Sequence, residues 1–243
     1  MARFFVDMPL SEDSVVVLPE TVVRHVQVLR LREGEALTLF NGQGGEYVAT
    51  LTQLDKRHAE CTVSRHDPVS RESPIWLGLA QAISSGDRMD FTLQKGVEMG
   101  VSVFQPLAAQ RSVVKLAGER ADKRLQRWQE IVIAACEQSG RTVIPRVLPI
   151  LTVSEWLASR QAASVQLLLS PLGTRSLQDI AQRPASAWLM AGPEGGYTPE
   201  EEGAALAAGW TPLRLGPRIL RTETAALAAV SAMQTVWGDY ALS

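Results

Sequence analysis

The chain has 243 residues, of which 46% are apolar and 21% charged, and it carries a net charge of −2 with a pI of about 6.0. This composition is typical of a globular protein with one large domain or two modest ones. The slight acidity argues against nucleic-acid binding through overall charge, so such binding would need a local basic patch.

The cysteine, histidine and apolar patterns exclude several further classes of protein. Cys61 and Cys136 lie far apart without Cys-x-x-Cys spacing, which predicts free thiols in a reducing cytoplasm. The three histidines are isolated, so we expect no metal site. The N-terminus lacks the apolar core of a signal peptide, and no apolar run approaches the roughly 18 residues that span a bilayer. We therefore expect a cytoplasmic protein that binds neither membrane nor metal.

Residues 1–70 are predicted to form a small β-barrel. Short β-type runs cover Arg3–Val6, Ser14–Leu18, Ala36–Phe40, Tyr47–Leu54 and Ala59–Ser64. The glycine-rich stretch 41–45 is a hairpin turn between two of these runs. One helix interrupts the strands, with Pro19 at its entry and apolar residues at helical spacing after it. The polar stretch 67–74 contains two prolines and is predicted to be a linker.

Residues 74–243 show alternating strand and helix patterns. Strands are predicted over Ile75–Ala80, Val101–Leu107, Val165–Leu169, Trp188–Ala191 and Pro212–Leu215, and helices over Met89–Met99, Asp122–Ser139 and about Thr224–Trp237. Two capping boxes, Thr152-x-x-Glu155 and Thr198-x-x-Glu201, predict the starts of two more helices. This alternation predicts an α/β domain in which helices cover both faces of a parallel sheet.

Three loops of this second part follow strand-like runs: Ser170–Gly173, the turn Gly192–Gly196 and the stretch Leu215–Ala225. In open parallel sheets, ligands bind beyond the carboxyl ends of the strands, and glycine lets backbone groups approach a ligand closely. The loops therefore predict a site for a flat ligand with polar edges. Neither Gly-x-Gly-x-x-Gly after the first strand nor a P-loop motif is present, so we do not expect a standard dinucleotide, class I methyltransferase or P-loop site.

Basic residues gather in the middle of the chain. Between residues 86 and 146 there are ten Lys and Arg against seven Asp and Glu. The excess of basic residues comes from the stretch 111–127, which contains six Lys and Arg and only two acidic residues, Glu119 and Asp122. This patch is compatible with a phosphate-backbone partner. A solvated helix face is an equally good interpretation of the patch when it is considered alone.

Several sequence blocks together resemble a known family. They are His25-Val-Gln-Val-Leu-Arg30, Lys95–Val101, Glu137-Gln-Ser-Gly-Arg141, Gly192–Gly196 and Leu220-Arg-Thr-Glu-Thr-Ala225. In this order and at these separations they resemble the RsmE-type 16S ribosomal RNA uridine N3-methyltransferases of the SPOUT class, over essentially the whole chain. The resemblance implies a PUA-like RNA-binding barrel over 1–70. Over 74–243 it implies a trefoil-knotted SPOUT domain that binds S-adenosylmethionine and forms a homodimer. Periodicity could not suggest a knot, because chain connections are normally unthreaded.

The resemblance also implies which residues line the pocket for the methyl donor. Apolar side chains would sandwich the adenine, and backbone groups of the loops would bind its edge. With the loop glycines Gly195 and Gly216, the expected residues are Leu169, Gly192, Glu194, Gly196, Leu215, Ile219, Leu220, Thr222 and Ala225.

Methylation of uracil N3 sets further chemical demands. The base must be unpaired, and N3 must lose its proton before or during attack on the methyl group. Glu137 and Glu223 are the candidate bases, and the neighbouring Arg141 and Arg221 could hold a uracil oxygen or a phosphate. Neighbouring Glu and Arg residues also commonly form structural ion pairs, so both interpretations stay open.

The expected partner is 16S rRNA in the small ribosomal subunit. The expected phosphate-binding residues are Arg24, Arg30, Arg32, Arg111, Arg120 and Arg124. A ribose 2′-O-methyltransferase on the same fold is disfavoured, because that family usually carries an Asn-rich motif where this chain has Glu137-Gln138-Ser139. A non-catalytic RNA-binding or ribosome-assembly protein is disfavoured too, because a pure binder would not need an intact pair of donor loops.

Overall fold

The computed structural model of the chain describes residues 1–159, 163–180 and 182–240. The chain divides into two compact units, the first made of Met1–Glu72 and Cys136–Ile144 and the second of Ser73–Ala135 and Pro145–Ser243. The sequence predicts the segment 136–144 as part of the second domain, whereas in the structure it packs with the first unit. The predicted end of the second domain, 241–243, lies outside the described residues.

The first unit is a five-stranded sheet with one helix. Its strands are β1 (Ala2–Phe5), β2 (Val15–Val17), β3 (Ala36–Phe40), β4 (Glu46–Leu54) and β5 (Ala59–Asp67), in the order β1-β3-β4-β5-β2. β1 pairs with β3 in parallel, and the other pairs are antiparallel. Helix α1 (Glu20–Val28) begins after Pro19, as predicted. Alternating apolar residues of the strands pack with α1 into one core, which includes the fully buried Phe4, Val23 and Leu37. This unit has the PUA-like fold that the sequence predicts.

The second unit is built on a parallel sheet with the order β12-β10-β11-β6-β7-β8, and β9 also pairs with β7. The strands are β6 (Trp76–Ala82), β7 (Val103–Ala108), β8 (Arg146–Val147), β9 (Leu151–Thr152), β10 (Val165–Leu169), β11 (Ser186–Ala191) and β12 (Thr211–Leu213). Because the strands are parallel, their carboxyl ends meet at one edge, where the loops of the site lie.

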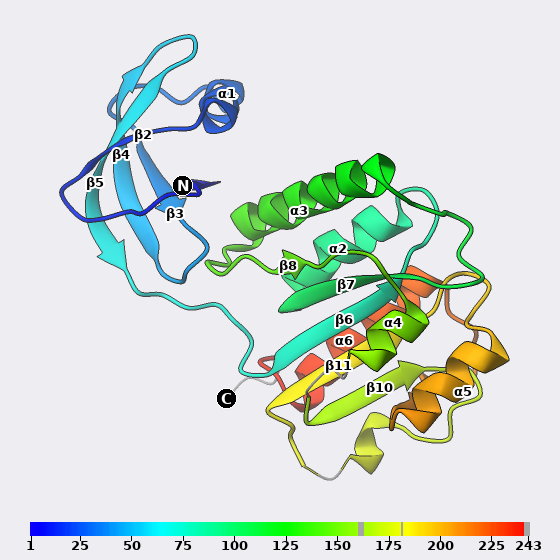
Figure 1. Cartoon of the computed structure of the whole chain (residues 1–243). Coiled ribbons are helices and arrows are strands. Elements are labelled where there is room, and N and C mark those ends of the chain that lie inside the picture. Colours follow the sequence, from blue (N-terminus) through cyan, green and yellow to red (C-terminus); the bar gives the residue numbers. More distant parts are fainter. Residues whose placement is uncertain (160–162, 181, 241–243) are drawn as a thin grey trace. The chain divides into compact units, whose positions relative to one another are not determined.

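Helices cover both faces of this sheet, with α4 and α5 on one face and α2 and α6 on the other (Figure 1). Their bounds are α2 (Arg88–Glu98), α3 (Glu119–Ser139), α4 (Val153–Ala158), α5 (Pro199–Ala207) and α6 (Thr222–Val236), with a 3₁₀ turn at Leu177–Asp179. Both predicted capping boxes are confirmed, because the Thr152 and Thr198 hydroxyls each accept the N–H of the glutamate three residues later. Helix α6 starts two residues before the predicted Thr224, because the extended residue Arg221 is its N-cap.

The side chains of β6 alternate between the two faces of the sheet, and this alternation positions the site. Ala80 and Ala82 join a core on the α4–α5 face that is dominated by buried tryptophans, among them Trp156 and Trp188 with ring centroids 5.3 Å apart. Gln81 between them points to the opposite face, where α6 begins. Gly78 on the same face leaves room for Trp188, because an added Cβ there would overlap the Trp188 ring.

No helix within the described ranges is long and apolar enough to cross a bilayer. The same ranges contain no group of three or more His, Cys, Asp or Glu side chains that could hold a metal ion.

Candidate functional site

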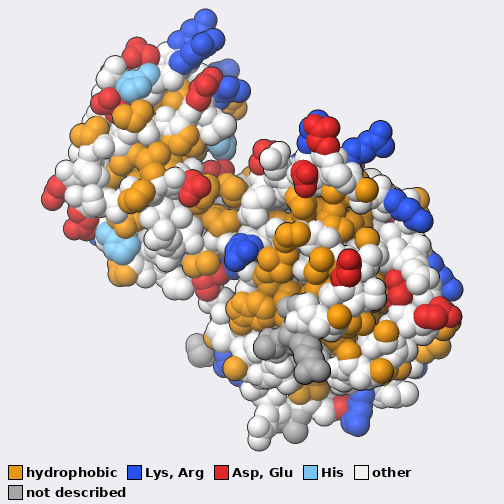
Figure 2. Space-filling view, viewed as in Figure 1, with side chains coloured by type: hydrophobic (Ala, Val, Ile, Leu, Met, Phe, Trp, Pro, Cys, Tyr) orange, Lys and Arg blue, Asp and Glu red, His pale blue; other side chains and the backbone are white. Residues whose placement is uncertain are grey.

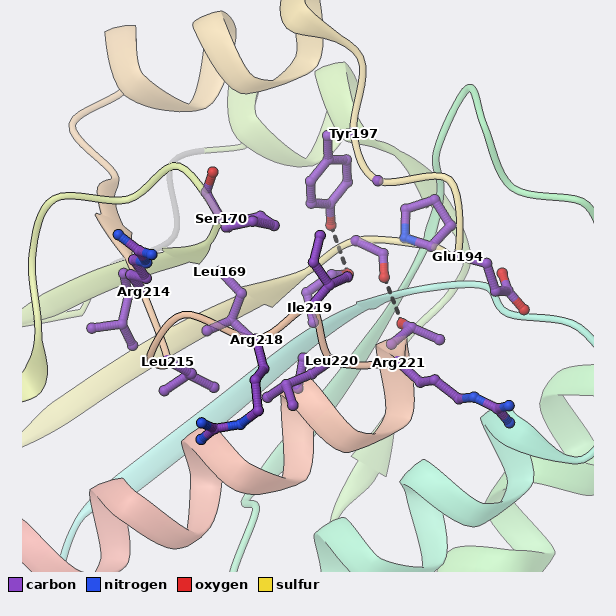
Figure 3. A pocket seen from close by; sticks show the side chains of 18 of the residues that line it. Leu169, Ser170, Glu194, Tyr197, Arg214, Leu215, Arg218, Ile219, Leu220 and Arg221 are labelled. Atoms are coloured by element: carbon purple, nitrogen blue, oxygen red, sulfur yellow. Dashed lines mark hydrogen bonds between the residues drawn. The ribbon is translucent and has the colours of Figure 1, made fainter.

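The second unit contains a cavity of about 450 Å³ at the carboxyl ends of β10, β11 and β12 (Figure 3). Its wall consists of residues from three chain segments that follow these strands, Leu169–Pro171, Ala191–Tyr197 and Leu213–Ala225, together with Arg88 of α2 and Glu202 of α5. The volume lies within the range of small-molecule and cofactor sites. The sequence predicts these three loops as the site, and the structure brings them together around one cavity.

Most residues that the sequence predicts for the methyl-donor pocket line this cavity. They are Leu169, Gly192, Glu194, Gly196, Leu215, Gly216, Ile219, Leu220, Thr222 and Ala225. Gly195 does not line the cavity. An added Cβ at Gly195 would lie 3.2 Å from the Arg111 Cβ, so this glycine faces the neighbouring loop.

The cavity wall also includes residues that sequence reasoning missed. Arg88, Tyr197, Glu202, Arg214 and Arg218 all contribute to it. Arg214 directly precedes the predicted loop Leu215–Ala225 and Arg218 lies within it, so their position two residues from Gly216 is a signal that could have found them. Arg88 precedes the loops by about a hundred residues, and no local pattern marks it.

Two short hydrogen bonds hold the wall of the cavity (Figure 3). The Thr222 hydroxyl donates to the Gly192 carbonyl at 2.5 Å and so joins the Leu215–Ala225 loop to the Gly192–Gly196 turn. The buried Tyr197 hydroxyl donates to the Ala191 carbonyl at 2.9 Å. Burial raises the pKa of Tyr197 well above its usual value, so this phenol stays a hydrogen-bond donor.

The side chain of Glu194 fixes the glycine turn to the start of α2. Its Oε1 accepts hydrogen bonds from the Ser85 N–H at 2.9 Å, the Ser85 hydroxyl at 2.8 Å and Arg88 at 2.7 Å. Partial burial raises the pKa of Glu194, but these donors outweigh it and lower the pKa to about 2. Glu194 is therefore a carboxylate that orients the turn, and it has no proton to exchange near neutral pH.

The rim of the cavity is positively charged. Arg214 donates through Nε to the Gly216 carbonyl at 3.0 Å. The guanidinium groups of Arg218 and Arg221 form no hydrogen bond or ion pair with any other described residue, and their side chains extend in opposite directions (Figure 3). Two exposed cations at the mouth of a ligand cavity favour an anionic partner.

Of the four predicted catalytic residues, Arg221 and Glu223 belong to the unit with the cavity. Arg221 lines it, and Glu223 lies in the first turn of α6. The Glu223 Oε2 atom is buried and accepts no hydrogen bond from the residues that the structure describes. A buried carboxylate oxygen without a donor is unusual and favours a proton-accepting or ligand-binding role.

Glu137 and Arg141 belong to the first unit and do not line the cavity. Glu137 Oε1 accepts the Phe5 backbone N–H at 2.9 Å. Burial raises the pKa of Glu137, and the Phe5 N–H opposes this only in part. Arg141 is 4% exposed and donates through Nε to Glu72 Oε2 at 3.0 Å. These partners stabilise the packing of segment 136–144 on the first unit. The catalytic role of the two residues stays a prediction.

The basic residues of the first unit lie at its surface. Arg24 and Arg30 are exposed, on α1 and just after it, and so is Arg32. Arg24 is paired with Glu20 at 2.8 Å. Arg30 has a positive φ of 57°, which ends the helix. Because neither Arg30 nor Arg32 forms an ion pair with another described residue, both are better placed than Arg24 to bind a phosphate.

The basic patch of the second unit is less uniform than its composition indicates. Arg111 donates to the Gly195 and Tyr197 carbonyls at 3.1 and 3.2 Å, so it braces the glycine turn. Arg120 is exposed on α3 and Arg124 is half-buried there. Other cations of α3 are paired, Lys123 with Glu119 and Arg127 with Asp90. Figure 2 shows positive and negative side chains interspersed in this region.

Fold and site together define a class: a PUA-like unit followed by an α/β unit whose ligand cavity is made by loops late in the chain. Comparison with protein families agrees with this description. Residues 71–234 match the family model of an RNA methyltransferase domain, and residues 18–64 match the model of an RNA methyltransferase PUA domain.

Individual relatives resemble the chain over nearly its whole length. A ribosomal RNA small subunit methyltransferase E from Neisseria gonorrhoeae, crystallised with S-adenosyl methionine, is 49% identical and has a TM-score of 0.93 over 99% of this chain and 100% of its own. A Legionella pneumophila protein with bound S-adenosylmethionine is 36% identical, with a TM-score of 0.95 over 98% of each chain. The Bacillus subtilis ribosomal RNA small subunit methyltransferase E is 32% identical over 96% of each chain. The chain belongs to the ribosomal RNA small subunit methyltransferase E family.

Proposed function

We propose that this protein transfers the methyl group of S-adenosylmethionine to N3 of a uridine in the 16S RNA of the small ribosomal subunit. The observation that carries the proposal is the cavity formed by the three predicted loops. It lies in a chain that is 49% identical, over 99% of its length, to a relative crystallised with S-adenosyl methionine. N3 of uridine is the finer part of the proposal, and it rests on the sequence resemblance.

The residues around the cavity fit this methyl donor. Leu169, Leu215 and Leu220 offer apolar surface for the adenine ring. The backbone N–H groups of Leu215, Ile219 and Leu220 donate to no acceptor among the described residues, so they can bind the polar edge of a ligand. S-adenosylmethionine supplies a methyl group that its sulfonium has already activated. The task of the protein is therefore to hold donor and acceptor in line and to accept one proton.

Glu223 is the better placed of the two candidate bases. Its Oε2 has no donor among the described residues, and it follows directly on Arg221 and Thr222 of the cavity wall. We propose that Glu223 accepts the N3 proton and that Arg221 stabilises the negative charge that develops on the uracil oxygens. Glu137 and Arg141 remain the alternative pair, which a second subunit could supply.

RNA binding is assigned to both units. Arg30 and Arg32, with Arg24, would bind phosphates through the first unit, and Arg120 and Arg124 would do so through the second. The protein would act in the cytoplasm, where rRNA is found, as a homodimer with a trefoil-knotted second unit. The dimer and the knot follow from the family resemblance.

Two measurements test this function. Isothermal titration should show S-adenosylhomocysteine binding to the purified protein. Mass mapping should show that 16S rRNA from a deletion strain lacks one base methylation. Restoring the gene should restore that methylation. Binding without any change in the rRNA would favour a non-catalytic RNA-binding protein. A methyl group lost from a ribose would favour 2′-O-methylation.

A further inference from the structure

A buried glutamine lies behind the cavity without lining it. Gln81 in β6 is fully buried, and its side-chain amide donates two hydrogen bonds. One goes to the Ala82 carbonyl at 3.0 Å and the other to the Thr222 hydroxyl at 2.9 Å. Thr222 in turn donates to the Gly192 carbonyl at 2.5 Å. The strand, the start of α6 and the glycine turn are thus joined by one chain of hydrogen bonds.

The direction of this chain is determined by its members. The Ala82 carbonyl can only accept, so the amide nitrogen of Gln81 must face it and Thr222. The Thr222 hydroxyl has a single proton. Because its oxygen accepts from Gln81, that proton goes to the Gly192 carbonyl. Gln81 therefore holds the hydroxyl in the orientation that joins the two loops.

This arrangement does not serve core stability well. Gln81 Oε1 is buried and accepts no hydrogen bond from the described residues. An unpartnered buried acceptor is unfavourable, and an apolar side chain of the same shape is often as stable or more stable. A polar side chain that is costly to bury and directed at a ligand cavity points to a functional constraint.

We propose that Gln81 is a positioning residue for the methyl donor. By orienting the Thr222 hydroxyl, it sets the separation of the Gly192–Gly196 turn and the Leu215–Ala225 loop, and so the fit of the cavity to its ligand. The inference rests on the proposed function, because it takes S-adenosylmethionine as the ligand. Gln81 itself touches neither donor nor RNA.

The neighbouring strand offers a matched control. Gln105 in β7 is 2% exposed, and its amide nitrogen also donates two hydrogen bonds, to the Pro106 carbonyl at 2.9 Å and the Pro149 carbonyl at 2.8 Å. It lies opposite Ala80 in the register, one strand away from Gln81. Its partners are not part of the cavity wall. Gln81→Met and Gln105→Met thus make the same chemical change at fully or almost fully buried positions of the same sheet, on its two opposite faces.

The test is titration of full-length variants with S-adenosylhomocysteine, together with melting temperatures. Gln81→Met should raise the Kd for S-adenosylhomocysteine about fivefold, which is the loss of affinity expected when about one hydrogen bond is removed. Its melting temperature should change no more than that of Gln105→Met. Gln105→Met should bind within twofold of the wild type. In steady-state assays Gln81→Met should raise KM for the donor and leave kcat nearly unchanged.

A double-mutant cycle shows whether Gln81 acts through Thr222. Thr222→Val should also weaken binding, Thr222→Ser should restore it, and Gln81→Met with Thr222→Val should bind no worse than Thr222→Val alone. Additive losses would overturn the proposed route. Unchanged binding in Gln81→Met would overturn the proposal itself. If Gln81→Met does not fold, Thr222→Val tests the same hydrogen bonds, and unchanged binding in that variant would contradict the role.

One measurement needs no ligand and separates this inference from the proposed function. Hydrogen exchange of the ligand-free protein should be faster over 214–221 in Gln81→Met than in Gln105→Met. Equal exchange overturns the positioning role whatever the protein binds. A wild-type protein that does not bind S-adenosylhomocysteine would instead overturn the proposed function, and the exchange experiment would still decide whether Gln81 holds the loops.

Discussion

Arg88 and Glu194 form an ion pair of 2.7 Å, although they lie 106 residues apart in the sequence. Arg88 begins α2 and Glu194 lies in the glycine turn, and both side chains line the cavity. Ser85 adds two hydrogen bonds to the same carboxylate oxygen. The Gly192–Gly196 turn is therefore held at two points, by Arg88 of α2 through Glu194 and by Thr222 through the Gly192 carbonyl.

The Glu194 carboxylate should make the stability of the protein depend on pH. Its pKa is about 2 in the folded protein, against an ordinary value of 4.5. A lowered pKa stabilises the folded state above pH 4.5, and this contribution is lost as pH falls through the folded pKa. The unfolding free energies of wild type and Glu194→Gln should therefore differ by a constant amount above pH 4.5 and converge below it. Urea denaturation at a series of pH values measures this difference.

Arg88→Gln should lower the unfolding free energy above pH 4.5 by part of the amount seen for Glu194→Gln, because it removes one of the hydrogen-bond donors to Glu194. A difference between wild type and Glu194→Gln that persists unchanged far below pH 4.5 would show that this carboxylate is not held as described.

Gly196 should be intolerant of any side chain for two separable reasons. Its φ is +67°, which disfavours an L-residue, and it lines the cavity. Gly209 has a φ of +91° with open space around it, and it lies outside the cavity. Gly196→Ala and Gly209→Ala should each destabilise the protein by about 1 kcal/mol. Only Gly196→Ala should weaken S-adenosylhomocysteine binding, about tenfold or more. Equal affinities in both variants would remove the glycine turn from the site.

The catalytic proposal distinguishes the two candidate bases. Glu223→Gln should lower turnover at saturating RNA about a hundredfold or more, with the donor Kd unchanged, because it removes the proton acceptor. Glu137→Gln should mainly lower the stability of the first unit, because Glu137 accepts the Phe5 N–H. Single-turnover methylation and thermal melting of both variants check this. A folded Glu137→Gln variant with the larger catalytic loss would reverse the assignment.

RNA binding by the first unit should appear in its salt dependence. Replacing Arg30 and Arg32 with Gln should flatten the plot of log affinity against log salt by roughly one unit, or slightly less, per lost phosphate contact. Donor affinity should not change. Arg65→Gln, at another exposed arginine of the same unit, is the control and should leave the slope as it is. Normal methylation by the Arg30/Arg32 variant across a salt series would show that this unit does not bind the RNA.

Local sequence signals predicted the framework of the site well. Glycine turns, capping boxes and strand patterns depend on neighbouring residues, so the loops 192–196 and 215–225 could be located from the sequence. Arg88 could not, because it reaches the cavity only through the fold. The packing of Glu137 on Phe5 is likewise a contact between distant segments, and no periodicity encodes it. The same holds for Gln81, since its role depends on a partner 141 residues away.

The central proposal is that the protein, with S-adenosylmethionine in this cavity, methylates N3 of a uridine in 16S rRNA. The most direct measurement incubates the purified protein with small ribosomal subunits and S-adenosylmethionine labelled in its methyl group, then separates the nucleosides of the digested rRNA by mass spectrometry. We predict labelled 3-methyluridine from subunits of a deletion strain, and much less of it when Glu223→Gln or Gly196→Ala replaces the wild type under the same limiting conditions. Label in 2′-O-methyluridine, or no labelled nucleoside with the wild-type protein, would contradict this function.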